Sequence, residues 1–194
     1  MPPASGGAAA VRPPERPEDM SLRRRQGRRN NRAGPLTMAG ERTAHVGLGA
    51  NLGNAEQAVR SALVRLGELD GTRLVVHSSL YRTAPVDAGG PDYVNAVAEL
   101  STRLSAFELL ARLQELEAEA RRERPARNAP RTLDLDLLLY GNARLDTPVL
   151  QVPHPRMMQR AFVLVPLAEI APHLVPAPAL QAVADQIVVR LPPG

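Results

Sequence analysis

The stretch LVVHSSLYRTAPVDAGGPDYVNAVAELSTR, residues 74–103, decides the fold. It predicts one strand over Leu74–Arg82 and a second over Tyr93–Arg103, because both segments are rich in β-branched and aromatic residues. The Pro- and Gly-rich segment between them spans only about ten residues, too few for the crossover helix that parallel strands need. The two strands should therefore pair antiparallel.

Periodic segments extend outward from this pair. A strand is predicted over Ala44–Ala50 and an amphipathic helix over Ala55–Leu69, where apolar residues recur at helical spacing. After the central strands, Ser105 with a glutamate three residues later is typical of a capping box, and it opens a helix that runs to Arg122. A further strand is predicted over Thr132–Tyr140.

The last part of the chain completes the predicted domain. Asn142–Val152 indicates a hairpin or an extended excursion, and Phe162–Ile170 and Ala179–Arg190 indicate helices. Single strands that alternate with helices on a partly antiparallel sheet are typical of an α+β layered fold. Residues 38–194 suffice for one such domain with a proper core.

Composition excludes several classes of function. The sequence has no cysteine and few aromatic residues, so it offers neither thiol chemistry nor the stacking platforms of single-strand nucleic-acid binders. All 24 basic residues are arginine, and eight of them precede Met38. The high pI therefore describes the first 37 residues and not the folded part. No segment has the length and apolarity of a membrane span, which predicts a cytoplasmic protein.

Residues 1–37 should be disordered, because they hold too few large aliphatic side chains to offset the entropy of ordering. Met38 is then the expected start of the protein, since periodic sequence begins shortly after it. An arginine-rich leader also permits a transit peptide, although this one has no amphipathic pattern.

The strongest chemical signal is PRTLDLDLLLY, residues 130–140. Side chains alternate between the two faces of a strand, so the leucines at 133, 135 and 137 should enter the core while Asp134 and Asp136 emerge together on the other face. Their Cα atoms would lie about 6.5 Å apart, close enough for both carboxylates to bind one Mg²⁺ or a pair of ions. A solvated polar face is the alternative for an isolated Asp-x-Asp.

Arginines surround this pair in the sequence. Arg121, Arg122, Arg124 and Arg127 lie upstream, and Arg131 precedes Asp134 by three positions. Paired carboxylates with guanidinium groups are typical of phosphoryl transfer, which makes a nucleoside triphosphate the expected ligand. Helix-terminal arginines can also simply pair with nearby glutamates, but Arg127 and Arg131 lie beyond the helix.

Two other motifs are weaker when taken alone. His154 lies between two prolines and near Arg160, so its ring is held rigidly where it could bond a phosphate. Tyr93 and Asn95 share a strand face, and a flat ring beside an amide suits a heteroaromatic ligand. An ordinary surface histidine and an ordinary strand tyrosine are the alternatives.

The segment GLGANLG, residues 47–53, invites comparison with dinucleotide-binding turns. Its third glycine comes one residue too late for G-x-G-x-x-G, and the antiparallel strands exclude the parallel unit that such a site needs. The glycines are better explained by a tight turn between strand and helix.

Taken in order, these motifs resemble the 6-hydroxymethyl-7,8-dihydropterin pyrophosphokinases of folate biosynthesis. The resemblance rests on GLGANLG, YRTAP, PDYVN, PRTLDLD and PHPR followed by Arg160 and Phe162, and it covers Ala44–Ile170. It implies a ferredoxin-like layered α/β/α sandwich in a single domain. It also implies transfer of the β,γ-pyrophosphoryl group of MgATP to the pterin hydroxymethyl oxygen, with release of AMP.

The resemblance also implies roles for individual residues. Asp134 and Asp136 would bind two Mg²⁺ ions, and catalysis would further use Arg124, Arg131 and either Arg122 or its neighbour Arg121. The implied pterin contacts are Thr83, Ala84, Pro85, Val86, Tyr93, Asn95 and Phe162, and the implied ATP contacts are Gln114, Glu117, Arg131, His154 and Arg160. The enzyme should act as a monomer, without nucleic acid or membrane.

The alternative function is a non-catalytic ferredoxin-like module. Such a module would bind a pterin or a nucleotide, or would bind RNA through the arginine-rich first 37 residues. Catalysis that persists without residues 1–37 would favour the enzyme.

Overall fold

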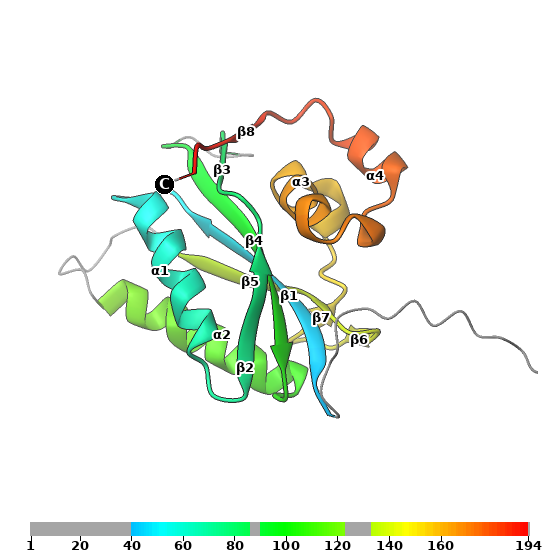
Figure 1. Cartoon of the computed structure of the whole chain (residues 1–194). Helices are drawn as coiled ribbons and strands as arrows, with labels where there is room; N and C mark the ends of the chain where they lie inside the picture. The colour runs from blue at the N-terminus through cyan, green and yellow to red at the C-terminus, as the bar shows by residue number, and fades with distance from the viewer. Residues whose placement is uncertain (1–39, 86–89, 123–132, 194) are drawn as a thin grey trace, which may run out of the picture. The chain divides into compact units, whose positions relative to one another are not determined.

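A six-stranded sheet forms the centre of the folded unit, with helices on both of its faces (Figure 1). The computed structural model describes residues 40–85, 90–122 and 133–193. The strands of the sheet are β1 (Arg42–Ala50), β2 (Thr72–His77), β3 (Tyr81–Thr83), β4 (Tyr93–Thr102), β5 (Asp134–Tyr140) and β8 (Val188–Arg190).

The strand order is β5–β1–β4–β3–β8, and β2 pairs with β4 next to β3. The antiparallel pairing predicted for the central strands is confirmed, since both β2 and β3 run antiparallel to β4. The sequence predicts a partly antiparallel sheet, whereas every pairing among the described strands is antiparallel. The fold is therefore α+β with an antiparallel sheet.

Two long helices cover one face of this sheet, α1 (Ala55–Gly67) and α2 (Ala106–Arg122). The start of α2 is the capping box that the sequence predicts: Ser105 Oγ accepts from the Glu108 N–H at 3.3 Å, and the Glu108 carboxylate accepts from the Ser105 N–H at 2.7 Å. The helix α1 ends at Gly67 rather than at the predicted Leu69.

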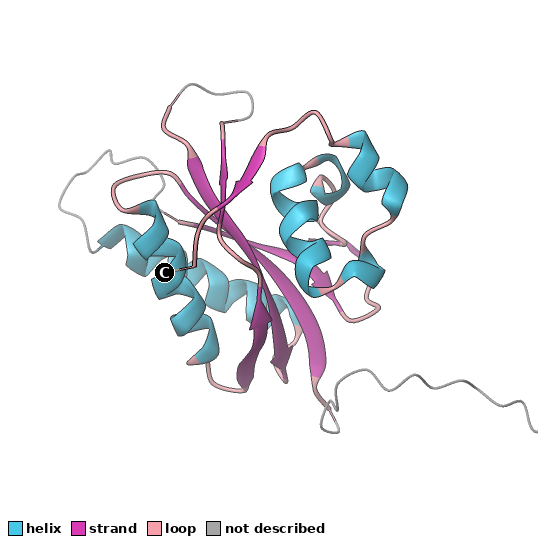
Figure 2. Cartoon of the chain, turned by 45° about the horizontal axis from the view of Figure 1, so that its top comes forward, coloured by secondary structure: helices cyan, strands magenta, loops and turns pink. Residues whose placement is uncertain are grey.

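Apolar side chains build a separate core on each face of the sheet. Leu135 and Leu137 of β5 are buried in the core beneath α1 and α2. Leu138 belongs to the second core, with α3 (Ala161–Ile170) and α4 (Ala177–Ala182). Figure 2 shows these two helix pairs on opposite sides of the strands.

The strand predicted over Leu74–Arg82 is interrupted at residues 78–80, which separate β2 from β3. The buried Ser78 hydroxyl accepts from the Val97 N–H at 3.0 Å and donates to the Ser79 carbonyl at 2.7 Å. A serine side chain that takes over hydrogen bonds of the backbone ladder ends the regular pairing at that point.

The helix predicted over Ala179–Arg190 is wrong beyond Ala182. The helix α4 ends at Ala182, and the strand β8 follows at the edge of the sheet, antiparallel to β3 (Figure 1). Residues 187–189 are all β-branched and favour a strand, and the otherwise unpaired edge of β3 provides the partner.

Shorter elements link these parts. They are the predicted hairpin of β6 (Leu145–Asp146) and β7 (Gln151–Val152), and two 3₁₀ turns, η1 (Met157–Gln159) and η2 (Pro172–Leu174). The elements named above all belong to one compact unit, Leu36–Gly194. The predictions for residues 1–37 lie outside the described residues. Within the described ranges, no helix is long and apolar enough to cross a membrane.

Candidate active site

The predicted carboxylate pair lies on β5, at one edge of the sheet. Asp134 pairs with Gly49 of β1 and Asp136 pairs with Gly47, so each carboxylate has a neighbour without a side chain. The leucines at 133, 135 and 137 are buried in the opposite core, which confirms the predicted alternation of the two faces. The strand β1 thus places no side chain beside either carboxylate.

Gly49 links the aspartates to the next strand. It also pairs with Asn95 of β4, so Asp134, Gly49 and Asn95 form one row across the sheet. Asn95 is buried and its Nδ2 donates to Thr83 Oγ1 at 2.8 Å. A Cβ atom at Gly49 would lie 3.2 Å from Asn95 Oδ1, closer than an ordinary contact. The row therefore leaves little room for any side chain at Gly49.

A pocket of about 570 Å³ lies over this row, between the sheet and the start of α3. It brings together eight of the residues that the sequence predicts for the site, from both halves of the chain. They are Thr83, Ala84, Tyr93, Asn95, Asp134, Asp136, Arg160 and Phe162. We call it the acceptor pocket.

A cation and an aromatic ring stand at the wall of the acceptor pocket. The Arg160 guanidinium carbon lies 5.3 Å from the centre of the Phe162 ring, and its Nη1 lies 4.0 Å from Asp136 Oδ2. Burial and the nearby Arg156 lower the pKa of Arg160, yet an arginine remains charged at neutral pH. This cation is placed to bind an anionic group next to Asp136.

A second pocket of about 390 Å³ shares Asp136 with the first. Leu110, Leu150 and His154 are among its lining residues, and we call it the donor pocket. Burial lowers the pKa of His154, and Arg160 adds to this effect while Asp136 opposes it. The ring is therefore neutral at neutral pH, in agreement with Nδ1 accepting from the Arg156 N–H at 3.3 Å.

Other predicted residues are placed differently. Gln114 is exposed on α2 and does not line either pocket. Glu117 accepts from the Leu135 N–H at 2.7 Å and so connects α2 to β5. Pro85 is half-buried just beyond β3 and does not line the acceptor pocket.

Some of the predicted site residues, or their side chains, lie outside the described part of the chain. Val86, Arg124 and Arg131 lie outside the described residues, and Arg122 is the last residue of α2, with its side chain not described. Their assignment stays a prediction.

Three polar side chains that line the acceptor pocket were missed by the sequence reasoning as members of the site: Arg156, Gln159 and Gln186. Arg156 is the arginine of the PHPR motif and Gln159 follows it by three positions, so the spacing of this motif to Arg160 carried a usable signal. Gln186 carried none, because it lies in a segment predicted as helix and reaches the pocket only through the path of the chain between α4 and β8.

Paired carboxylates and an arginine beside an aromatic-lined pocket are typical of enzymes of the phosphotransferase class. The chain belongs to the 7,8-dihydro-6-hydroxymethylpterin-pyrophosphokinase (HPPK) family, whose family model matches residues 45–172. The resemblance seen in the sequence is thereby confirmed.

Two bacterial relatives are similar along most of their length. The 2-amino-4-hydroxy-6-hydroxymethyldihydropteridine pyrophosphokinase of Haemophilus influenzae is 46% identical over 134 residues, which are 69% of this chain and 84% of the relative. The protein of the same name from Pseudomonas aeruginosa is 48% identical over 131 residues, 67% of this chain and 81% of the relative.

A solved structure shares the fold. The HPPK-DHPS A437G chain of Plasmodium falciparum matches with a TM-score of 0.53 at 12% identity, over 68% of this chain and 42% of that longer chain. The chain thus spans about two fifths of that neighbour, and the likeness concerns the fold alone.

Proposed function

We propose that the chain transfers the pyrophosphoryl group of ATP to the hydroxymethyl oxygen of 6-hydroxymethyl-7,8-dihydropterin in folate biosynthesis. The observation that carries this proposal is that two pockets meet at Asp136. One holds aromatic and amide groups suited to a pterin, and the other holds apolar residues and His154. Family membership makes the alternative of a non-catalytic module less favoured.

The acceptor pocket would hold the pterin between Tyr93 and Phe162. Asn95 would read the edge of the pterin, since its amide keeps one N–H and its carbonyl oxygen after the bond to Thr83. The backbone at Thr83, Ala84, Pro85 and Val86 would complete that edge.

The carboxylates fit Mg²⁺ that arrives with a nucleotide. They are oxygen ligands on one strand face, and the described residues provide no third His, Cys, Asp or Glu that would complete a protein-only metal cluster. Mg²⁺ commonly takes one or two carboxylates and fills its remaining positions with phosphate oxygens and water. We propose that Asp134 and Asp136 hold two such ions. When bound, Mg²⁺ would neutralise phosphate charge and acidify the pterin hydroxyl.

The protein's own groups would orient the reaction. The pterin oxygen forms a bond to the β-phosphorus of ATP, the bond from that phosphorus to the α,β-bridging oxygen breaks, and AMP leaves. Arg160 would bind the transferred phosphates, neutral His154 would donate a hydrogen bond to them, and Asp136 would accept the hydroxyl proton. Gln114, Glu117, Arg122, Arg124 and Arg131 are proposed to complete the ATP side.

We also propose the finer features of the protein. The chain order of β1, α1, β2 with β3, β4, α2 and β5 supports a ferredoxin-like layering. The domain would be residues 38–194, monomeric, cytoplasmic and without a nucleic-acid partner, preceded by a disordered extension.

The test separates the products by chromatography after incubation of the chain with MgATP and the dihydropterin. AMP and a pterin diphosphate that form only when both substrates are present would support the proposal. ADP in place of AMP would contradict pyrophosphoryl transfer. Absence of product despite binding of both substrates would favour the non-catalytic module.

A further inference from the structure

The first turn of α3 is capped by a residue from a distant part of the chain. The N–H of Ala161, the first residue of α3, donates to Gln186 Oε1 at 2.9 Å, and Gln186 Nε2 donates to the Gln159 carbonyl at 3.0 Å. Arg160 occupies the N-cap position and, within the described residues, makes no side-chain capping bond. Gln186 therefore supplies the acceptor that the helix start needs.

The two hydrogen bonds of Gln186 hold the backbone on either side of Arg160. Phe162 follows Ala161 in the chain. Arg160 and Phe162 are the cation and the aromatic ring at the wall of the acceptor pocket. Gln186 also lines this pocket, but both of its polar atoms bond to backbone groups. It is thus arranged to act through Arg160 and Phe162 rather than through direct chemistry.

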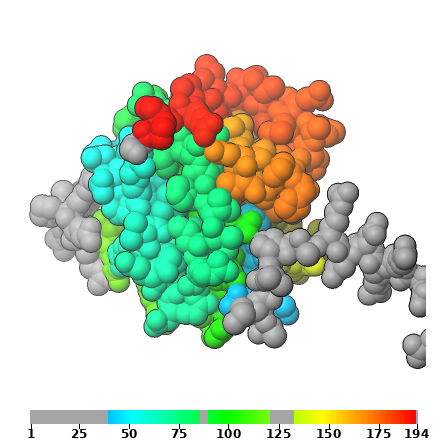
Figure 3. Space-filling model, viewed as in Figure 1, coloured from blue at the N-terminus to red at the C-terminus, as the bar shows by residue number. Residues whose placement is uncertain are grey.

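Gln186 is itself held from the side of α4. Its backbone N–H donates to the Val183 carbonyl at 3.1 Å, and Val183 is buried in the core beneath α3. In the space-filling view, the C-terminal residues in red adjoin the orange surface of α3 (Figure 3).

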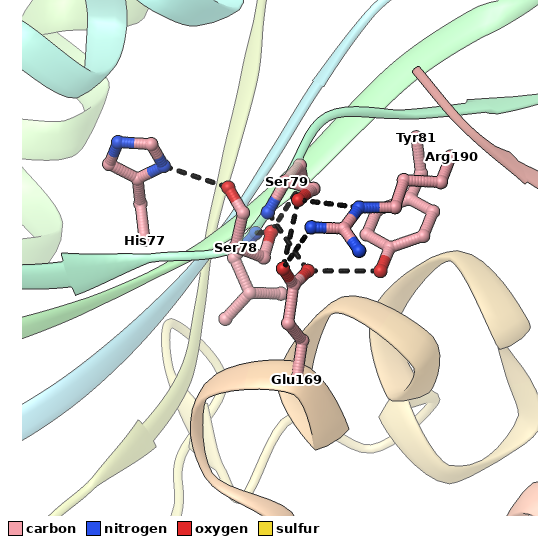
Figure 4. Close-up of polar contacts among 7 residues, drawn as sticks. His77, Ser78, Ser79, Tyr81, Glu169 and Arg190 are labelled. Atoms are coloured by element: carbon pink, nitrogen blue, oxygen red, sulfur yellow. Dashed lines mark hydrogen bonds and ion pairs between the residues drawn. The ribbon is translucent and has the colours of Figure 1, made fainter. Parts of the chain in front are cut away.

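The strand β8 follows Gln186 in the chain, and a polar cluster around Glu169 holds this strand in place (Figure 4). The Glu169 carboxylate of α3 accepts from Arg190 Nη2 at 3.2 Å, from the Ser79 hydroxyl at 2.8 Å and from the Tyr81 hydroxyl at 2.9 Å. Burial acts against these bonds, yet the bonds prevail and the pKa of Glu169 is lowered. The segments before and after Gln186 are thus both held in place. This lowers the conformational entropy that the Gln186 side chain loses when it forms its two hydrogen bonds.

We propose that Gln186 is a positioning residue for the acceptor pocket: it fixes the backbone around Arg160 and so orients Phe162 against the ring of the acceptor. This inference rests on the proposed function for the identity of the acceptor. The capping contact itself does not depend on that function.

The test compares Gln186→Met, which has similar length but neither hydrogen bond, with Gln181→Met, an exposed position on α4 that lines neither pocket. Titration calorimetry measures binding of the dihydropterin in the presence of Mg²⁺ and a non-hydrolysable ATP analogue. Gln186→Met should weaken binding about five- to tenfold, as expected for the loss of one or two hydrogen bonds. Gln181→Met should match the wild type.

A double-mutant cycle separates positioning from general destabilisation. In a Phe162→Ala background, Gln186→Met should weaken pterin binding less than about twofold, because the ring that it orients is gone. An equal loss in both backgrounds would overturn the proposal, and so would unchanged binding in Gln186→Met.

Amide hydrogen exchange at Ala161 gives a readout that needs no ligand. The Ala161 amide should exchange at least about tenfold faster in Gln186→Met, whereas Gln186→Glu keeps the acceptor and should keep the protection. Equal exchange in Gln186→Met and the wild type would overturn the capping role. If the wild type bound no pterin while Ala161 behaved as expected, the proposed function would fail and the cap would stand.

Discussion

Asp136 is the side chain shared by the acceptor and donor pockets, and it is half exposed, 4.0 Å from Arg160. Asp136→Asn keeps its shape and removes its charge. We expect turnover to fall at least about 100-fold, because the variant loses the group proposed to accept the hydroxyl proton, and a positioned general base contributes about that much. AMP release measures it.

Asp146→Asn is the matched control for this change. Asp146 is an exposed aspartate on β6, outside both pockets, where Gln151 Nε2 donates to it at 2.8 Å. It should retain full turnover. Normal turnover in Asp136→Asn would remove this carboxylate from the mechanism.

Gly49 offers a steric test of the row that joins the aspartates to Asn95. In Gly49→Ala the new methyl group would lie 3.2 Å from Asn95 Oδ1, so the amide oxygen that faces the ligand must move by a few tenths of an ångström. We expect binding of the dihydropterin to weaken about tenfold, as for a displaced buried hydrogen-bonding group. Calorimetry of the pterin measures it.

Gly67→Ala serves as the control for Gly49→Ala. At the end of α1 the added methyl group would meet only Leu74 Cβ, at an ordinary 3.5 Å. Its pterin affinity should equal that of the wild type. If Gly49→Ala also bound normally, Asn95 would not read the ligand in the orientation described.

At the scale of elements, the parts of the fold that could be predicted from sequence are those with a local cause. The short connection before Tyr93 made antiparallel pairing necessary, and the Ser105 capping box set the start of α2. The strand β8 could not be predicted in this way, because its partner β3 lies about a hundred residues earlier. Its β-branched residues became a strand only because that edge was available.

The residues of the candidate site also fall into two groups, those that local sequence patterns bring together and those that depend on contacts between distant segments. Asp134 and Asp136 share a face because of the period of a strand, and Arg160 and Phe162 are two residues apart, so local patterns sufficed to group them. The arrival of Gln186 at the same pocket depends on the packing of α4 and the pairing of β8. No periodic pattern in the sequence predicts that Gln186 lies beside Arg160 and Phe162.

Ser78 tests the junction between β2 and β3. Ser78→Ala removes the acceptor of the Val97 N–H and leaves that donor buried. We expect the free energy of unfolding to fall by about 1–3 kcal/mol, the usual cost of an unsatisfied buried group. Urea unfolding measures it. The exposed Ser61 of α1 is the control, since Ser61→Ala should change the stability very little. Equal stabilities would mean that the hydroxyl does not hold the junction.

At the scale of the whole molecule, a buried histidine in the sheet makes stability depend on pH. His45 of β1 is 4% exposed, and its Nε2 lies 3.3 Å from Glu99 Oε2. Burial lowers the pKa of His45, with Glu99 opposing and His173 adding to the shift. The unfolded chain therefore binds the proton more readily than the folded protein does. Stability is then fully present above the ordinary histidine pKa and is lost as the pH falls below it.

Urea unfolding at pH 7.5 and at pH 5.5 measures this dependence. The wild type should lose stability at the lower pH, by at most about 1.4 kcal/mol per pH unit for one proton. His45→Gln should lose less, although His154, whose pKa is lowered in the same direction, keeps part of the effect. The same pH dependence in both proteins would show that His45 does not carry it.

The cap that Gln186 provides at the start of α3 also bears on how the enzyme is made. Translation delivers the sheet centre, the aspartates and the pocket wall before it delivers Gln186, and the pairing of β8 with β3 joins segments far apart in the chain. Contacts of such long sequence separation form slowly. A nascent chain that has folded as far as α3 would thus hold the proposed contacts from Tyr93, Asn95 and Phe162 and still lack the bond from Gln186 that orients Phe162. Full affinity for the acceptor would then be gained only after Gln186 has been synthesised and has bonded to Ala161.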